Sequence, residues 1–288
     1  MKILVTGANG FIGKRFMELA KSRFELIPLS LRNKNIAELN LQGADAIVHL
    51  AGKAHQINNE DEQVFFEVNY KLTQQLADRA LVENIPHFVF ISTLRVYGIE
   101  VNGILNETSP CLPVDAYGKS KLQTEQYLQS LDQLKMKVAI VRPPMVYGPE
   151  VQGNTLRLLN LCNKNLPLPF ANTKNFRSVV FTDNMLELII TILQQQQSGI
   201  FLSADDKPVS TDAFLSLVKK HLNNKTPLLS LPGFLRNVLK RIRPDLYNSI
   251  YNSFIIDTAQ TNKLLNFTPP HSTNEGVAKM AAWFKSLK

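Results

Sequence analysis

The chain opens with a short apolar segment that runs directly into a glycine-rich loop. Residues 2–6, Lys-Ile-Leu-Val-Thr, are typical of a buried strand, and Gly7, Gly10 and Gly13 follow before a helical pattern begins. This order places backbone N–H groups and the positive end of a helix against a diphosphate. The three-residue spacing differs from the common fingerprint, and a tight turn without a ligand would show the same glycines. The segment predicts an α/β fold and indicates a dinucleotide-binding loop.

Two later segments have the apolar character of buried parallel strands. One apolar run, residues 46–50, is followed by Ala51 and Gly52. Another, residues 87–92, is followed by Thr93. Strand and helix patterns alternate along the chain, which predicts a Rossmann-type doubly wound parallel sheet. Ligands bind such sheets at the carboxyl ends of the strands. Thr93 is therefore placed to donate a hydrogen bond to a substrate carbonyl, unless its hydroxyl only satisfies local backbone.

A tyrosine and a lysine follow at helical spacing. Tyr117 and Lys121 are four residues apart, so they share one helix face. A free tyrosine titrates near pH ~10, and lowering its pKa to ~7 takes roughly 4 kcal/mol, which a nearby ammonium and a nicotinamide ring together can supply. The phenol can then exchange a proton while the nicotinamide carries the hydride. Alone, such a pair is more often a solvated helix face; Thr93 and the glycine loop supply the context.

These motifs resemble an extended short-chain dehydrogenase/reductase of the nucleotide-sugar epimerase/dehydratase family. The resemblance covers nearly the whole chain, and it implies a smaller C-terminal substrate lobe beside the sheet. It also implies that Thr93, Tyr117 and Lys121 form the catalytic triad. The matching segments, in family order, are Thr-Gly-Ala-Asn-Gly-Phe-Ile-Gly (6–13), His-Leu-Ala-Gly (49–52), Ser-Thr-Leu-Arg-Val-Tyr-Gly (92–98), Tyr117 with Lys121, and Arg-Pro-Pro-Met-Val-Tyr-Gly-Pro (142–149).

The resemblance also implies the binding residues. It places Asn69 near the active-site strand. The expected substrate ligands are Thr93, Arg95, Asn154 and Arg177, of which the arginine suits a diphosphate because its fork donates hydrogen bonds in pairs. The expected cofactor-binding residues are Gly7, Asn9, Gly10, Phe11, Ile12, Ser30, Arg32, Leu50, Ala51, Gly52, Tyr117 and Lys121.

The end of the second strand bears on the choice of cofactor. NAD sites usually place an Asp or Glu there, but residues 24–29 are followed by Ser30 and Arg32, with no acid before Glu38. A serine and an arginine can accept a 2′-phosphate, so we expect NAD(P)H and favour NADPH; a solvated basic turn with NAD bound is the alternative. Arg15 is a weaker second candidate.

The segment between the second and third strands is short. Residues 31–45 have room for one crossover but not for an additional strand and helix. We therefore expect a sheet one strand shorter than is usual in the family, with an altered adenine pocket.

Prolines after residue 142 and the resemblance together predict two parts. The dinucleotide-binding domain comprises residues 1–148 with a returning segment at about 176–199, and the substrate lobe comprises residues 149–175 and 200–288. At 288 residues and 44% hydrophobic residues, the chain can bury a sizeable core. We expect that the chain can form a homodimer.

Composition also bears on location and metal binding. Cys111 and Cys162 are the two cysteines, which argues against a disulfide framework. We see no secretory signal and no apolar run of the ~20 residues that a membrane span needs, so we expect a cytoplasmic protein. The five histidines lack metal-ligand spacing, so we expect no metal.

The net charge of +8 is scattered, and we expect no nucleic-acid partner. One concentration of basic residues lies within residues 234–243, which alternate them with apolar residues at helical spacing. This segment could associate weakly with an anionic membrane surface. The more common alternative is that its apolar side belongs to the core of the substrate lobe.

The C-terminal half narrows the resemblance. Residues 166–184 and 201–211 are similar to a bacterial branch of surface-polysaccharide enzymes, which implies an NAD(P)H-dependent reductase of a UDP-4-keto-6-deoxy-N-acetylhexosamine that forms UDP-QuiNAc or UDP-FucNAc. The alternatives are a UDP-hexose or UDP-N-acetylhexosamine 4-epimerase with tightly bound NAD, and a non-catalytic nucleotide-binding protein docking at a membrane. Dehydratases are disfavoured because Leu94 and Arg95 replace their Asp-Glu pair.

Overall fold

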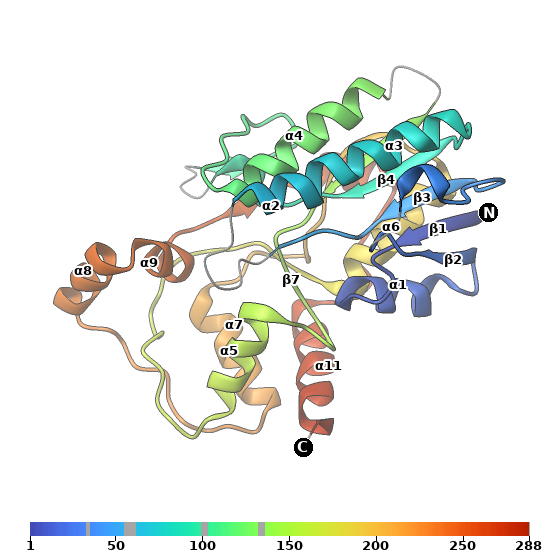
Figure 1. The fold of residues 1–288 in the computed structure, drawn as a ribbon. Helices are drawn as coiled ribbons and strands as arrows, with labels where there is room; N and C mark the ends of the chain where they lie inside the picture. The colour runs from blue at the N-terminus through green and yellow to red at the C-terminus, as the bar shows by residue number, and fades with distance from the viewer. Residues whose placement is uncertain (33–34, 55–61, 99–102, 132–135, 288) are drawn as a thin grey trace.

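The computed structural model describes residues 1–32, 35–54, 62–98, 103–131 and 136–287. Its centre is a six-stranded, all-parallel sheet with the order β2-β1-β3-β4-β6-β9 (Figure 1). The strands are β1 (Lys2–Thr6), β2 (Glu25–Leu29), β3 (Ala46–His49), β4 (His87–Ile91), β6 (Lys137–Arg142) and β9 (Gly199–Leu202). The central strands are buried on both faces, which explains their continuous apolar sequences.

Helices cover both faces of this sheet. Ile3 and Val5 point to a core shared with α1 (Phe11–Ala20) and α6 (Thr182–Gln195), whereas Leu4 points to the opposite core. That second core contains apolar residues of α3 (Leu72–Val82) and α4 (Ala116–Leu131). The alternation follows from the two-residue period of a strand. The predicted doubly wound Rossmann-type sheet is thus confirmed.

The helical segment between β3 and β4 is irregular. A short α2 (Gln63–Phe65) continues into a π-helical turn, η2 (Phe66–Lys71), before α3 begins. A π turn shifts the side chains that follow relative to an α-helix, and such turns are frequent at functional sites. Buried Asn69 lies within this turn.

The connection from β2 to β3 is a single short crossover, as the sequence predicted. In the described part of residues 31–45, the single helical element is a 3₁₀ turn, η1 (Ile36–Glu38). Asn35 caps this turn by accepting a hydrogen bond from Ala37 N at 3.1 Å. Ile36 and the two leucines that follow it pack into the core with α3.

A third core lies beside the sheet, on the side of the C-terminus (Figure 1). β7 (Met145–Tyr147) pairs with β8 (Val179–Phe181), and both pack against α5 (Gly153–Asn163), α7 (Thr211–His221) and α11 (Thr273–Ser286). The boundary expected at residue 200 is corrected, because β9 pairs with β6 in the main sheet. The division into two domains otherwise stays a prediction.

The remaining elements bridge these parts. The residues after β4 form a 3₁₀ turn, η3 (Leu94–Tyr97), and β5 (Ile104–Leu105) pairs with β10 (Ile255–Ile256). α8 (Gly233–Ile242) and α9 (Pro244–Tyr251) stand at one end of the molecule, and α10 (Ala259–Leu265) contacts α6.

A buried ion pair joins α4 to the sheet. Arg142 Nε lies 3.1 Å from Glu125 Oε1, and the two side chains are 3% and 0% exposed. Arg142 Nη1 donates to the Tyr97 hydroxyl at 2.7 Å, and that hydroxyl donates to Asn106 O at 2.8 Å. Pairing of this kind offsets the cost of removing both charges from water. The pair holds α4, β6 and η3 in one arrangement.

Arg142→Met should lower the free energy of unfolding by ~3–5 kcal/mol, because it leaves the Glu125 carboxylate buried without its partner. Adding Glu125→Leu should recover most of the loss. Arg23→Met, which breaks a surface pair with Glu187, is the control and should cost at most ~1 kcal/mol. Urea denaturation of the four proteins tests this, and a single variant no less stable than the surface control would contradict it.

Candidate active site

The three residues of the predicted triad meet at the carboxyl end of β4. Thr93 follows this strand, and its hydroxyl lies close enough to Tyr117, near the N-terminus of α4, to oppose the rise in the pKa of Tyr117 that burial causes. One turn later on α4, Lys121 Nζ donates to Ile91 O at 2.8 Å and lies 4.4 Å from the centroid of the Phe90 ring. The structure thus brings together residues that are up to 28 positions apart in the chain, from 93 to 121.

The start of α4 is set by Asp115. Its Oδ1 accepts a hydrogen bond from Gly118 N at 2.8 Å, as a helix N-cap does, and its Oδ2 accepts from Arg95 Nε at 2.9 Å. A Cβ on Gly118 would lie 2.8 Å from Arg95 O, so only glycine permits this close approach of η3 and α4. Asp115 therefore positions Tyr117. Sequence reasoning missed it, although an aspartate three residues before a helical glycine is a recognisable cap signal.

Burial dominates the electrostatics of the triad. It lowers the pKa of Lys121 to about 7, an effect that nearby Glu125 opposes. It raises the pKa of Tyr117, while the nearby Thr93 hydroxyl and Arg95 act in the opposite direction. That Lys121 and a nicotinamide ring together lower the pKa of Tyr117 stays a prediction; in this structure Lys121 Nζ donates to Ile91 O.

The glycine loop lies against the end of β3. Gly7 has φ +68°, and a Cβ there would lie 2.7 Å from Ala51 N. A Cβ on Gly13 would lie 2.1 Å from Gly7 O, so the first turn of α1 crosses the loop at backbone contact. Gly10 is the N-cap of α1 and provides no side-chain hydrogen bond. Free N–H groups at an uncapped helix start, next to a closely packed loop, fit a dinucleotide diphosphate.

The expected cofactor residues surround this loop. Phe11 and Ile12 begin α1, Asn9 is exposed in the loop, and Leu50 and Ala51 follow β3. A buried histidine stiffens the end of β3, because His49 Nδ1 lies 2.8 Å from Thr6 Oγ1 and its Nε2 lies 2.9 Å from Thr73 Oγ1. Burial, together with Lys121, lowers the pKa of His49 to about 3, so the imidazole is neutral.

Asn69 connects the two halves of the site. Its Oδ1 accepts from Lys53 N at 2.8 Å, and its Nδ2 donates to Lys53 O at 3.0 Å and to Ser120 Oγ at 3.1 Å. A Cβ on Gly52 would lie 3.1 Å from Asn69 Oδ1 and 3.3 Å from Lys121 Nζ. The position expected from the family resemblance, near the active-site strand, agrees with these contacts.

The residues expected to favour NADPH over NAD lie at the edge of the sheet. Ser30 directly follows β2, whose Leu29 is paired with Thr6, so Ser30 is level with Gly7; Ser30 and Arg32 are both exposed. Arg15, the weaker candidate, is engaged elsewhere. Its Nε and Nη2 lie 2.7 and 2.8 Å from the two carboxylate oxygens of Asp183.

Of the expected substrate residues, Thr93 and Arg95 lie at the triad, whereas Arg177 and Asn154 lie in other parts of the structure. Arg95, 52% exposed, is bound to Asp115. Arg177 Nη1 donates to Asn252 O at 3.0 Å at the end of α9, and burial lowers the pKa of its guanidinium. Asn154 is exposed on α5. Among the described residues, neither Arg177 nor Asn154 has a contact with the triad.

Ser92 is a further polar group at this edge. Its side chain is buried between β4 and Thr93, and among the described residues its Oγ has no hydrogen-bond partner. An unsatisfied buried hydroxyl is uncommon and suggests a polar ligand nearby. The sequence placed Ser92 at the strand end but assigned it no role.

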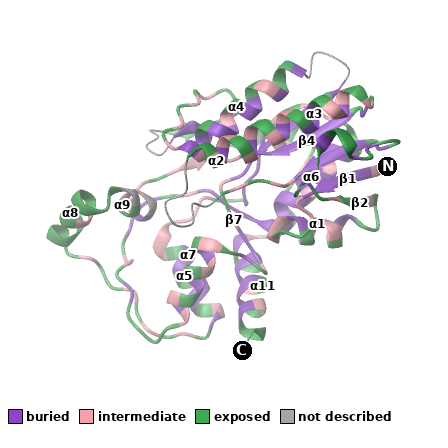
Figure 2. Cartoon of the chain, viewed as in Figure 1, coloured by how far each residue is buried: buried purple, intermediate pink, exposed green. Residues whose placement is uncertain are grey.

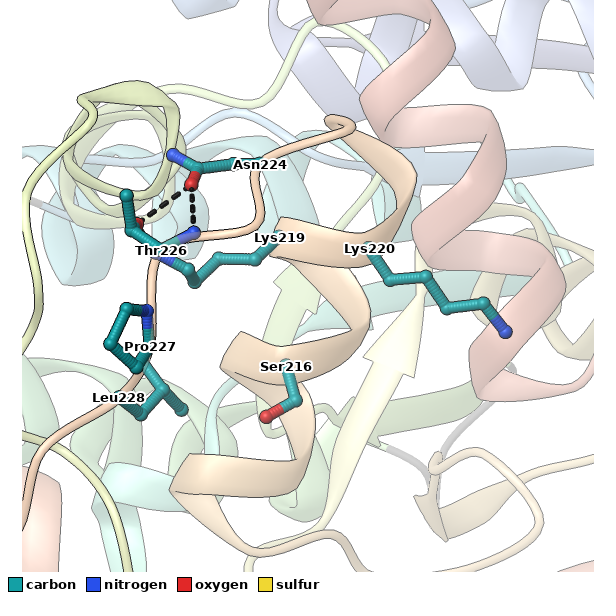
Figure 3. Close-up of a pocket in the computed structure, with 7 residues that line it drawn as sticks. All are labelled: Ser216, Lys219, Lys220, Asn224, Thr226, Pro227 and Leu228. Carbon is teal, nitrogen blue, oxygen red and sulfur yellow. Dashed lines mark hydrogen bonds between the residues drawn. The ribbon is translucent and has the colours of Figure 1, made fainter.

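A hollow of about 280 Å³ between α7 and the following loop is not the site (Figure 3). Two of its polar residues bond to each other, since Asn224 Oδ1 accepts from Thr226 N at 2.9 Å and from Thr226 Oγ1 at 2.7 Å. Over the described ranges, no three His, Cys, Asp or Glu side chains lie close enough to hold a metal. Within the same ranges, no helix is long and apolar enough to span a membrane.

Known proteins resemble this chain across its length. A family model described as "NAD dependent epimerase/dehydratase family" matches residues 3–202. A UDP-glucose 4-epimerase of Vibrio cholerae is 28% identical, covering 98% of this chain and 95% of that protein. An N-acetyl-alpha-D-glucosaminyl-diphospho-ditrans,octacis-undecaprenol 4-epimerase of Escherichia coli O157:H7 is 24% identical, covering 85% and 82%.

Solved structures share the fold. The UDP-glucuronic acid 4-epimerase of Bacillus cereus in complex with NAD has a TM-score of 0.82 at 22% identity and covers 100% of this chain and 99% of its own. A UDP-N-acetylglucosamine 4-epimerase from Methanobrevibacter ruminantium M1 has a TM-score of 0.83 at 19% identity, with the same coverage. At these identities the likeness supports the fold.

Gly13→Ala should destabilise the protein by ~1–3 kcal/mol and weaken dinucleotide binding, because its new methyl group would overlap the Gly7 carbonyl. Gly233→Ala is the matched control, since the nearest atom to its added methyl group is 3.9 Å away. It should be neutral or slightly stabilising. Thermal unfolding with and without dinucleotide measures both effects, and equal behaviour of the two variants would refute the assignment.

The buried ammonium of Lys121 should make stability depend on pH. With a folded-state pKa of about 7 and an ordinary value near ~10.4 when unfolded, the unfolded chain binds more protons between these limits. The free energy of unfolding should therefore rise from pH 7 to pH 10, and Lys121→Met should remove that part of the rise.

Lys119→Met, an exposed lysine on the same helix, is the control and should leave the slope unchanged. Urea denaturation of nucleotide-free protein across this range measures the slope. Identical slopes in the Lys121→Met and Lys119→Met variants would mean that burial does not lower the pKa of Lys121.

Proposed function

Because the chain belongs to the NAD dependent epimerase/dehydratase family, we propose that it is an enzyme that transfers a hydride at C4 of a UDP-linked hexose or N-acetylhexosamine, acting as a 4-epimerase. The observation that carries this proposal is the convergence of Thr93, Tyr117 and Lys121 at the carboxyl end of β4, beside the glycine loop. Thr93 and Tyr117 can both hydrogen-bond to one sugar oxygen, from two sides.

A dinucleotide bound at the glycine loop and Lys121 would supply reversible hydride transfer at C4. Tyr117 Oη takes the C4 hydroxyl proton and later gives it back, while Thr93 Oγ1 donates a hydrogen bond to the same oxygen. The nearby Thr93 hydroxyl and Arg95 both favour the tyrosinate, against the effect of burial. Lys121 Nζ has donors beyond the one that Ile91 O accepts, and these would hold the dinucleotide.

The substrate class rests on the relatives. The Vibrio cholerae protein is named for UDP-glucose, and the Methanobrevibacter structure is named for UDP-N-acetylglucosamine. We assign Arg177 and Asn154 to the nucleotide diphosphate. Arg177 has five N–H donors, so binding two backbone carbonyls of α9 leaves some of them for a ligand.

A second candidate is the reduction of a UDP-4-keto-6-deoxy-N-acetylhexosamine with NADPH. Ser30 and Arg32 favour it, because Ser30 stands level with Gly7 at the end of β2, where NAD sites usually carry an acid, and Arg32 follows two residues later. In this reaction Tyr117 donates a proton once, and a bound NADPH would supply the hydride.

We also propose a cytoplasmic location, a homodimer and the division into two domains.

One experiment separates the two candidates. The purified protein is denatured, its released dinucleotide is identified, and fresh protein is offered UDP-glucose, UDP-GlcNAc, undecaprenyl-diphosphate GlcNAc or UDP-4-keto-6-deoxy-GlcNAc. Interconversion of 4-epimers without added dinucleotide, with NAD released, supports the epimerase. NADPH consumption with the ketosugar alone would replace it with the reductase.

Tyr117→Phe should lower kcat by ~10²–10⁴-fold, because it removes the proton carrier. Dinucleotide affinity should change little. Tyr127→Phe is the control, since Tyr127 lies on the same helix but binds Asp78 at the surface. Steady-state turnover and dinucleotide titration test this; full activity in Tyr117→Phe would refute the triad, whichever reaction is catalysed.

A further inference from the structure

Helix α8 carries an apolar stripe that faces solvent. The stripe consists of Phe234, Leu235, Val238 and Ile242, which are 68%, 40%, 47% and 70% exposed. These positions share one side of a helix. None of the residues of α8 is buried, and the helix stands at the edge of the molecule (Figures 1 and 2). The alternative expected from the sequence, that this side belongs to the lobe's core, is wrong.

The basic side of α8 faces its neighbour instead. Lys240 Nζ lies 5.6 Å from the centroid of the Tyr247 ring on α9, and Arg236 lies close enough to Tyr251 to oppose the rise in its pKa that burial causes. α9 in turn is anchored to the lobe, because Thr211 Oγ1 donates to Ile250 O at 2.8 Å. The apolar stripe is thus held outward by a fixed support.

The charged residues of α8 have one sign. Residues 233–243 contain no Asp or Glu, and their basic residues are Arg236, Lys240, Arg241 and Arg243. A two-fold dimer through this stripe would bring two such basic segments together, since an isologous interface pairs each patch with its copy. An anionic surface complements both the charge and the apolar stripe.

We propose that α8 docks the protein on the surface of a bilayer that contains anionic phospholipid. The apolar stripe enters the boundary between headgroups and acyl chains, and Arg241 and Arg243 meet the lipid phosphates. The helix lies in the membrane plane rather than across it. This binding is independent of the hydride chemistry proposed above, so either can fail without the other.

The docking surface is connected to the substrate lobe through α9. Arg177 Nη1 donates to Asn252 O, at the end of that helix, and Phe254 N donates to Phe176 O at 2.8 Å. A membrane-bound α8 therefore holds the lobe that carries the proposed diphosphate residue at a fixed distance from the lipid surface.

Cosedimentation with vesicles tests the proposal. The full-length protein should bind vesicles of phosphatidylglycerol and phosphatidylcholine in equal parts at least about tenfold more tightly than phosphatidylcholine alone, and high salt should weaken this binding. Val238→Glu should weaken it by about tenfold or more. Arg241→Gln and Arg243→Gln should each weaken it about fivefold.

Val82→Glu is the matched control, because Val82 is 69% exposed on α3 in the other part of the molecule. It should bind vesicles as the unaltered protein does. If Val238→Glu is poorly folded by circular dichroism, Phe234→Ser provides the same test with a smaller change. Turnover of soluble substrate should be unchanged in all of these variants.

Three outcomes would overturn the proposal. Equal binding to neutral and anionic vesicles, or none to either, excludes an anionic bilayer as the partner. A dimer in sedimentation velocity that Val238→Glu dissociates would assign the stripe to a second copy of this chain. Salt-sensitive RNA binding that the same variant abolishes would assign it to nucleic acid.

Discussion

The candidate site depends on where one buried ammonium group is held. Lys121 Nζ binds Ile91 O at the end of β4 and lies over the Phe90 ring, with Gly52 leaving room beside it. Burial makes this charge costly, as its lowered pKa shows. The surrounding structure sustains it because Glu125, one turn along α4, is fixed by Arg142. Arg142, Glu125 and Lys121 thus form a line of charged side chains from β6 to the site, and their contacts set the position of α4.

Much of this arrangement could be predicted from the sequence. Family membership and the doubly wound sheet are confirmed, because both depend on local patterns: apolar runs, glycine positions and the four-residue spacing of Tyr117 and Lys121. Partners that are distant in the chain could not be predicted. Arg15 binds Asp183, which is 168 residues away, and Arg177 turns to the backbone of α9. No local pattern encodes which acid or carbonyl a basic side chain meets.

For helix α8, too, the sequence predicts the local structure but not its surroundings. The spacing of Phe234, Val238 and Ile242 predicts an amphipathic helix, and the structure contains it at Gly233–Ile242. The pattern is identical whether the apolar side meets a protein core or faces outward, because periodicity records only that the two sides differ. Its placement is decided by α9, whose tyrosines take the basic side and leave the apolar stripe exposed.

Backbone pairing connects that helix to the catalytic edge of the sheet. β7 follows β6 and pairs with β8, and just before β8 the backbone of Arg177 pairs with Val209 while Ser178 N donates to Phe254 O. Backbone hydrogen bonds of this kind resist bending more than side-chain contacts across loops do, since each fixes two segments at once. These pairings join α9 to the strands beside the main sheet. The orientation of the triad relative to any surface that α8 occupies therefore follows from the fold itself.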